Sequence, residues 1–272
     1  MADLEQDEIE SSRAPLIEHL IELRQRLLVL VIALVIAFVA CFIASEIIYG
    51  WLLLPYQGAA SQARGIPVEE LELTANFFAP MEFFFVKLKL AFFGAIMVIF
   101  PVIAWQVYSF VSPGLYSNEK GAFAPFLVLS PLLFAAGVSF VYYMVLPMVM
   151  RFSLGQEQIS DIAGVTIELL LNVSHYMNLV TLLMLVFGLS FQMPILMMLL
   201  AKAGIVRAET MLRGWRYAVV GIALFAAFAT PPDPISQILL GSAMLLLYFI
   251  SIGGMKLMEP KDDDDTDDTS DD

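Results

Sequence analysis

Six apolar runs dominate this chain and restrict the folds that it can adopt. A helix needs about 20 mostly apolar residues to cross the hydrocarbon layer of a bilayer, which is roughly 30 Å thick. With 60% hydrophobic and 15% charged residues, the sequence is more apolar than soluble domains, whose apolar share is about 45–50%. We therefore predict an all-α integral membrane protein. Four runs are long enough to span: residues 27–44, 90–107, 122–150 and 177–203.

The last two apolar runs are shorter and are separated by prolines. Residues 217–229 make a run of 13, or about 20 Å of helix, and residues 235–254 follow after the sequence TPPDP. The prolines must break the helix there. The pair forms either two short spans in a thinned bilayer or a re-entrant hairpin packed against protein; two short spans are favoured. The sequence thus predicts six transmembrane helices, the last two short, with both termini on one face.

The distribution of Lys and Arg orients this topology. Ten of these residues flank the spans on the face that holds both termini, and four lie on the other face. Because cytoplasmic loops carry the excess of basic residues, both termini are predicted to be cytoplasmic. The ten are Arg13, Arg24, Arg26, Lys120, Lys202, Arg207, Arg213, Arg216, Lys256 and Lys261, and the four are Arg64, Lys87, Lys89 and Arg151. The acidic N-terminus does not resemble a cleavable signal peptide.

Three segments are expected along the chain. Residues 1–26 form a cytoplasmic N-terminal segment, in which helical spacing of leucines predicts an amphipathic helix that runs into the first span. Residues 27–254 form the six-helix transmembrane domain. Residues 255–272 form an acidic tail, with eight Asp after Lys261. A disordered solubilising tail is favoured; a contribution to holding basic peptides near the membrane is the alternative.

Two residues of interest, Glu22 and Pro55, lie outside the apolar cores. Glu22 stands four residues before Arg26, which is the spacing of an intrahelical ion pair. Pro55 lies in the long outer connection, residues 45–82, which we interpret as a short amphipathic element over the outer ends of the helices. A helix start or a turn is the favoured role of Pro55, and docking of an outer cap is the alternative.

Polar residues inside or between the later spans are further candidates. Gln192 lies within the fourth span, where it either hydrogen-bonds neighbouring helices or lines a groove or ligand contact. Asp233 follows the proline pair and either caps the last helix or, with Thr230 and Gln237, offers a polar patch to a partner helix.

The motifs of hydrolytic enzymes are absent from the sequence. It contains no GxxxxGK[ST] loop, no HExxH, no GxSxG and no Cys/His cluster. The single cysteine, Cys41, excludes a disulfide framework and a Cys-based metal site. We therefore predict that the chain is not an enzyme and uses no metal or cofactor. A secondary transporter of a small solute is the rival class, although the spans lack the buried charges that proton-driven pumps usually show.

Four motifs give the chain a specific resemblance. HLIELRQR at 19–26, SFVSPGLYSNEK at 109–120, FGLSFQMP at 187–194 and TPPDPISQ at 230–237 together resemble TatC, the polytopic subunit of the twin-arginine protein translocase. The resemblance covers about residues 15–254. It implies a bacterial inner-membrane receptor that binds the twin-arginine signal peptides of folded proteins on the cytoplasmic face.

The resemblance also implies roles for individual residues. Glu22 and Glu119 correspond to the two acids of the family's receptor site, and two carboxylates suit two guanidinium groups in bidentate, charge-assisted hydrogen bonds. The remaining residues of the implied signal-peptide site are Leu20, Arg24, Phe110, Pro113, Gly114 and Tyr116.

Further expectations follow from the same resemblance. Thr230, Asp233 and Gln237 match the family's docking site for the single-span partners TatA and TatB, and Pro55 matches a proline of its outer cap. Gln192 stands where the family has an intramembrane acid, so a mechanism that needs a titratable carboxylate is in doubt here. The implied assembly is a multimeric receptor complex in membrane lipid, without nucleic acid, and transport is driven by the proton-motive force.

Overall fold

The fold is available from a computed structural model that describes the backbone of residues 2–71, 74–111, 120–159, 169–202, 204–230 and 233–258. Side chains are described within 20–71, 74–110, 126–157, 169–202, 204–230 and 233–257. The chain divides into two compact units, Met1–Gly188 and Leu189–Asp272.

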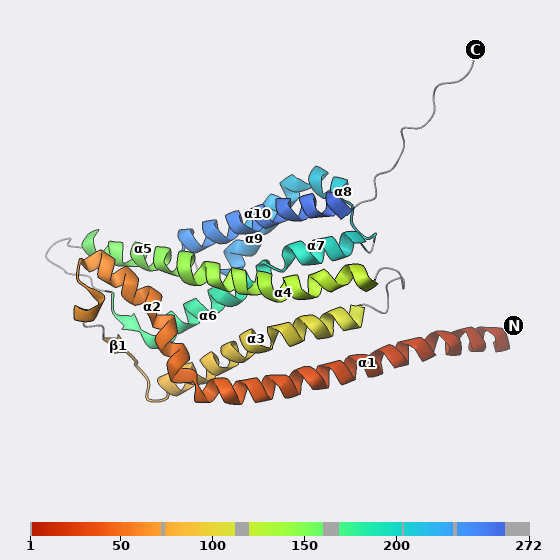
Figure 1. Ribbon diagram of the computed structural model, residues 1–272, viewed down its shortest axis with the longest axis horizontal. Coiled ribbons are helices and arrows are strands. Elements are labelled where there is room, and N and C mark those ends of the chain that lie inside the picture. Colours follow the sequence, from red (N-terminus) through yellow and green to blue (C-terminus); the bar gives the residue numbers. More distant parts are fainter. Residues whose placement is uncertain are drawn as a thin grey trace, which may run out of the picture. The chain divides into compact units, whose positions relative to one another are not determined.

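The described chain is helical over most of its length, which confirms the all-α prediction (Figure 1). Within the described ranges, five helical segments are long and apolar enough to cross a membrane, and α9 (Trp215–Ala229) is a shorter sixth apolar helix. The predicted set of six apolar helices is therefore confirmed. The five long segments are Leu20–Ile43, Glu82–Phe110, Phe126–Glu157, Val173–Lys202 and Pro234–Leu257.

The elements follow in this order. Those from the N-terminus to the fourth span are α1 (Ala2–Ile43), α2 (Ser45–Arg64), η1 (Val68–Glu70), β1 (Ala75–Asn76), α3 (Glu82–Val111), α4 (Lys120–Phe140), the π-helical η3 (Val141–Val145), α5 (Leu146–Ile159), β2 (Leu171–Asn172) and α6 (Val173–Ser190). The remainder are α7 (Met193–Lys202), α8 (Ala208–Arg213), α9 and α10 (Pro234–Met258).

In the first unit, α1 lies along α3 (Figure 1). Small residues form part of the contact: Ala37 of α1 packs with Ala95 of α3, beside the larger Ile99. Small side chains allow helix backbones to approach closely in a membrane, where lipid offers no hydrophobic driving force for association. Gly94 extends this close approach, since a Cβ there would lie 3.1 Å from the Sγ atom of Cys41. At these positions, small side chains therefore allow α1 and α3 to pack closely.

The structure corrects the prediction for Pro55, which lies inside α2 and neither starts the helix nor forms a turn. A proline within a helix removes the amide donor to the carbonyl four residues earlier, here Trp51. The hydroxyl of Tyr142 donates to the Trp51 carbonyl at 2.9 Å, and the hydroxyl of Tyr176 donates to the Leu52 carbonyl at 2.8 Å. These two tyrosines supply hydrogen bonds beside the proline, which explains why α2 continues for 20 residues.

The second span begins earlier than its apolar run indicates. Lys87 and Lys89, predicted to precede the span, lie inside α3. Each cation has a polar partner from another helix: Lys87 Nζ bonds the Glu46 carboxylate at 2.6 Å, and Lys89 Nζ bonds the Asn178 side-chain oxygen at 2.9 Å. Hydrogen bonding to Lys87 lowers the pKa of the Glu46 carboxyl. These partners let the helix extend through two charged residues.

The start of α3 is joined to the start of α6 by a short parallel bridge that the sequence did not reveal. Ala75 pairs with Leu171, and Asn76 pairs with Asn172. The Asn172 amide donates to the Glu82 carboxylate at 3.0 Å, and that carboxylate also accepts the Phe78 amide at 2.6 Å. The bridge thus holds the N-terminal ends of α3 and α6 beside each other.

In the second unit, the fourth span is interrupted between α6 and α7 at residues 191–192. Pro194, in the first turn of α7, cannot donate to the carbonyl of Ser190, so the helix breaks there. The last helix starts at Pro234, with Asp233 as its cap: Asp233 Oδ1 accepts the Ser236 amide at 2.7 Å. The capping interpretation of Asp233 is therefore observed. Of the last two helices, both predicted to be short, only α9 is short. The prediction is wrong for α10, which has 25 residues and continues past Gly254 to Met258.

Loss of one tyrosine hydroxyl tests the hydrogen bonding around Pro55. We expect Tyr176→Phe to lower the free energy of unfolding by about 1–3 kcal/mol, because the buried Leu52 carbonyl loses a donor. Tyr143→Phe is the matched control, since Tyr143 is 78% exposed. Denaturant unfolding in detergent, followed by tryptophan fluorescence, measures both. Equal stability of the two variants would contradict the assignment.

Candidate functional site

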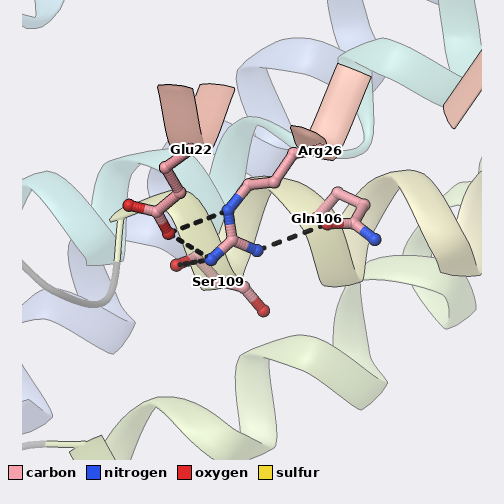
Figure 2. Close-up of polar contacts among 4 residues, drawn as sticks. All are labelled: Glu22, Arg26, Gln106 and Ser109. Atoms are coloured by element: carbon pink, nitrogen blue, oxygen red, sulfur yellow. Dashed lines mark hydrogen bonds and ion pairs between the residues drawn. The ribbon is translucent and has the colours of Figure 1, made fainter. Parts of the chain in front are cut away.

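The first unit brings four polar groups together where α1 and α3 run side by side. Figure 2 shows the guanidinium of Arg26 among Glu22, Gln106 and Ser109. Arg26 donates to the Glu22 carboxylate from Nε at 3.0 Å and also from Nη2. Its Nη1 donates to the Gln106 side-chain oxygen at 3.3 Å, and Nη2 donates to the Ser109 carbonyl at 2.9 Å. One arginine therefore connects an acid on its own helix to two groups on α3.

The geometry has a simple electrostatic basis. Ser109 lies in the last turn of α3, where carbonyl groups lack helical amide partners and the helix dipole is negative. The planar, five-donor guanidinium group can reach several acceptors at once, which an ammonium group reproduces poorly. The side chain of Arg26 is 22% exposed and that of Glu22 is 32% exposed. The acid is thus oriented by Arg26 while part of it stays accessible.

The sequence predicted only the local part of this cluster. Glu22 and Arg26 form the intrahelical pair that their spacing indicates. Gln106 and Ser109 were not predicted as its partners, because they are 80 and 83 residues from Arg26 along the chain. One signal was present: Gln106 is an uncharged polar residue within an otherwise apolar run, and such residues in spans usually contact protein or water.

The other predicted receptor residues fall into two groups. Leu20 is 63% exposed and Arg24 is exposed on α1, whereas Phe110 is half-buried in the last turn of α3. These three therefore lie on the two helices that carry the cluster. The remaining predicted residues, Pro113, Gly114, Tyr116 and Glu119, lie outside the described residues.

The predicted sites of the second unit occupy helix ends. Gln192 lies at the break between α6 and α7, is half-buried, and donates its backbone amide to Leu189 at 3.0 Å. Thr230 is buried at 6% exposure and its hydroxyl donates to Ala226 at 2.8 Å. Gln237 is half-buried in the first turn of α10. Thr230, Asp233 and Gln237 thus lie where α9 ends and α10 begins.

Metal-binding chemistry has no counterpart among the side chains that the structure describes. Within those ranges, no group of three or more His, Cys, Asp or Glu residues is placed to hold a metal ion. The arrangement at Glu22 and Arg26 is instead a hydrogen-bonding site that suits cationic, planar donors.

Comparisons with known proteins identify relatives across most of the chain. The sequence model of TatC, described as Sec-independent protein translocase protein, matches residues 18–242. A TatC protein of Magnetococcus marinus is 36% identical over 241 residues, covering 88% of this chain and 83% of the relative. One from Rickettsia prowazekii is 39% identical over 235 residues, covering 86% of this chain and 90% of the relative.

Solved structures give the same result. A crystal structure described as the twin-arginine translocase receptor TatC superimposes with a TM-score of 0.70 at 33% identity, covering 88% of this chain and 98% of that one. A second crystal structure of that receptor, in the detergent DDM, gives a TM-score of 0.72 at 34% identity.

Removal of the central guanidinium tests its role in joining α1 to α3. We expect Arg26→Gln to speed amide hydrogen exchange in residues 22–30 and 106–111 by about fivefold, because local opening loses roughly 1 kcal/mol of hydrogen bonding. Arg24→Gln is the matched control, since Arg24 is exposed on the same helix. Mass spectrometry of the detergent-solubilised protein measures the exchange. Unchanged exchange in Arg26→Gln would contradict this role.

Proposed function

This chain belongs to the TatC family of Sec-independent protein translocase proteins, and we propose that it is the receptor for twin-arginine signal peptides. The single observation that carries the proposal is the Glu22 carboxylate, part exposed and oriented by Arg26. In this role it binds the signal peptides of folded precursor proteins on the cytoplasmic face and, with partner subunits, mediates their export.

The chemistry of the pair supports such a receptor. A carboxylate offers about four acceptor positions, so Glu22 can accept a further guanidinium while it keeps its bonds to Arg26. Guanidinium groups bind carboxylates through two parallel hydrogen bonds, which the point charge of lysine cannot reproduce. A site of this kind therefore discriminates arginine from lysine by geometry rather than by charge.

The second carboxylate of the proposed receptor is Glu119. Arg26 bonds the Ser109 carbonyl, so the last turn of α3, which precedes Glu119 in the sequence, is joined to the helix that carries Glu22. In the proposed receptor, the two acids each receive one arginine of the motif. The residues that complete the proposed site are Leu20, Arg24, Phe110, Pro113, Gly114 and Tyr116.

The wider setting is proposed from the family and the charge distribution. Both termini are cytoplasmic in a bacterial inner membrane, with residues 1–26 as the cytoplasmic N-terminal segment, 27–254 as the membrane domain and 255–272 as the acidic tail. The single-span subunits TatA and TatB dock at Thr230, Asp233 and Gln237, and Pro55 lies in the outer cap. The receptor self-associates in a multimeric complex, and the proton-motive force drives transport.

Substitution of the two acids tests the receptor role. We expect Glu22→Ala and Glu119→Ala each to reduce photocrosslinking of a twin-arginine precursor by more than about tenfold, because a peptide guanidinium loses its carboxylate partner. Membrane insertion should stay normal. Glu69→Ala is the control, since Glu69 is an exposed acid in η1. Undiminished crosslinking in both variants would contradict the receptor role of the two acids.

Gln192 gives a separate test of hydrogen bonding in the membrane. We expect Gln192→Leu to impair export more than Gln192→Glu, because leucine removes every hydrogen-bonding atom whereas glutamate keeps acceptors in the same shape. Export of a twin-arginine reporter protein in cells measures the effect, with expression level as the control. The reverse order would refute a hydrogen-bonding role.

A further inference from the structure

A basic and aromatic patch in the second unit is not used by the proposed receptor. We define the α8–α9 patch as Arg213, Trp215, Arg216 and Tyr217, which follow one another where α8 ends and α9 begins. With Leu212 and Val220 they line a hollow of about 540 Å³. Both arginines are exposed, and Tyr217 is 85% exposed. The patch therefore offers two guanidinium groups and two aromatic rings on one surface.

The arginines of the patch are not neutralised within the described part of the chain. The ion pairs among the described side chains are Glu22–Arg26, Arg64–Glu157 and Glu46–Lys87, and they involve neither arginine. Arg216 lies 5.9 Å from the centroid of the Trp215 ring, a cation–π contact that leaves its charge intact. The patch is thus complementary to an anion.

The position of the patch beside α10 indicates what kind of anion it would meet. Tyr248 donates its hydroxyl to the Met211 carbonyl of α8 at 2.7 Å, so α8 contacts α10 ten residues before the helix ends at Met258. Those residues make about 15 Å of helix. Beyond Tyr248, α10 still exposes Ile250 at 55% and Leu257 at 89%. The arginines therefore lie at a level where the neighbouring helix is still apolar.

The length of α9 explains how a charged patch can lie at that depth. A helix of 15 residues is about 22 Å long, shorter than the roughly 30 Å hydrocarbon layer. A short span is accommodated by a locally thinned bilayer and by basic side chains that reach the headgroups. At the patch, lipid phosphate groups would meet the two guanidinium groups.

An exposed apolar stripe continues from the patch down α9. Tyr217, Val220, Leu224 and Phe228 follow helical spacing, and they are 85%, 67%, 59% and 84% exposed. Their spacing places them on one face of the helix. A ligand that satisfies both features has an anionic head for the arginines and an apolar chain for the stripe.

We propose that the α8–α9 patch is a binding site for an anionic phospholipid, whose phosphate is held by Arg213 and Arg216 and whose acyl chain lies along α9. In the topology proposed above this lipid belongs to the cytoplasmic leaflet. The acidic tail is a poorer occupant, because it has no apolar part for the stripe and begins beyond the far end of α10. An apolar partner helix would cover the stripe but would leave both arginines unpaired.

Lipid retention by the purified full-length chain tests the proposal. The protein in detergent is mixed with phosphatidylglycerol or phosphatidylcholine, and the retained lipid is counted by native mass spectrometry. We expect phosphatidylglycerol to be preferred by at least about tenfold, and Arg213→Gln with Arg216→Gln to abolish that preference. Arg207→Gln with Lys256→Gln is the matched control, because it removes two exposed charges outside the hollow and should keep the preference.

Four results would overturn the proposal. If the patch variant prefers phosphatidylglycerol as strongly as the unmodified chain does, the two arginines do not bind the lipid. If the control variant loses the preference equally, the effect comes from net charge alone. A rise in retained lipid after truncation at Met258 makes the acidic tail the occupant. If the patch variant loses a copurified single-span protein while its lipid retention is unchanged, the patch is a protein interface. Signal-peptide crosslinking at Glu22 is a separate readout, so the two proposals can fail independently.

Discussion

The absence of water in the hydrocarbon layer is the constraint on which the rest of this structure depends. Every backbone amide and carbonyl there must find a partner within the protein, and helices meet that requirement except where proline intervenes. In α2, which is not one of the candidate spans, the hydroxyls of Tyr142 and Tyr176 likewise supply donors to carbonyls near Pro55. At the start of α10, Asp233 supplies an acceptor. At both positions, polar side chains supply hydrogen bonds beside a proline.

The sequence predicted those parts of the fold that depend on local pattern. The apolar runs located six helices, and the spacing of Glu22 and Arg26 gave their ion pair. It misplaced features that depend on distant partners. Lys89 seemed to lie outside a span because Asn178, its partner, is 89 residues away along the chain. Pro55 was predicted to start a helix or form a turn, because no local pattern indicates the two tyrosines that donate hydrogen bonds to carbonyls beside it.

The same distinction applies to the candidate site. The acid and the arginine come from one turn of α1, whereas Gln106 and Ser109 come from α3 and reach Arg26 only after the two helices pack. That packing includes the small residues Ala37 and Ala95. In the proposed receptor, a carboxylate already shared with Arg26 binds one further arginine weakly. High affinity then requires both acids at once, and the second contact benefits from effective concentration.

The continuous helix α1 has a mechanical consequence. Glu22 lies 21 residues before Ile43, where α1 ends, and this stretch is about 32 Å long. A helix of that length without a proline or π-turn would tilt as one rigid segment about its junction with α2. A change in tilt of about 10°, well within the range that membrane helices adopt, would displace the Glu22 end by roughly 5–6 Å. The hydrogen bonds from Arg26 to α3 hold the Glu22 end of this helix. Breaking them would allow a small change of tilt at the α2 end to become a larger displacement of Glu22.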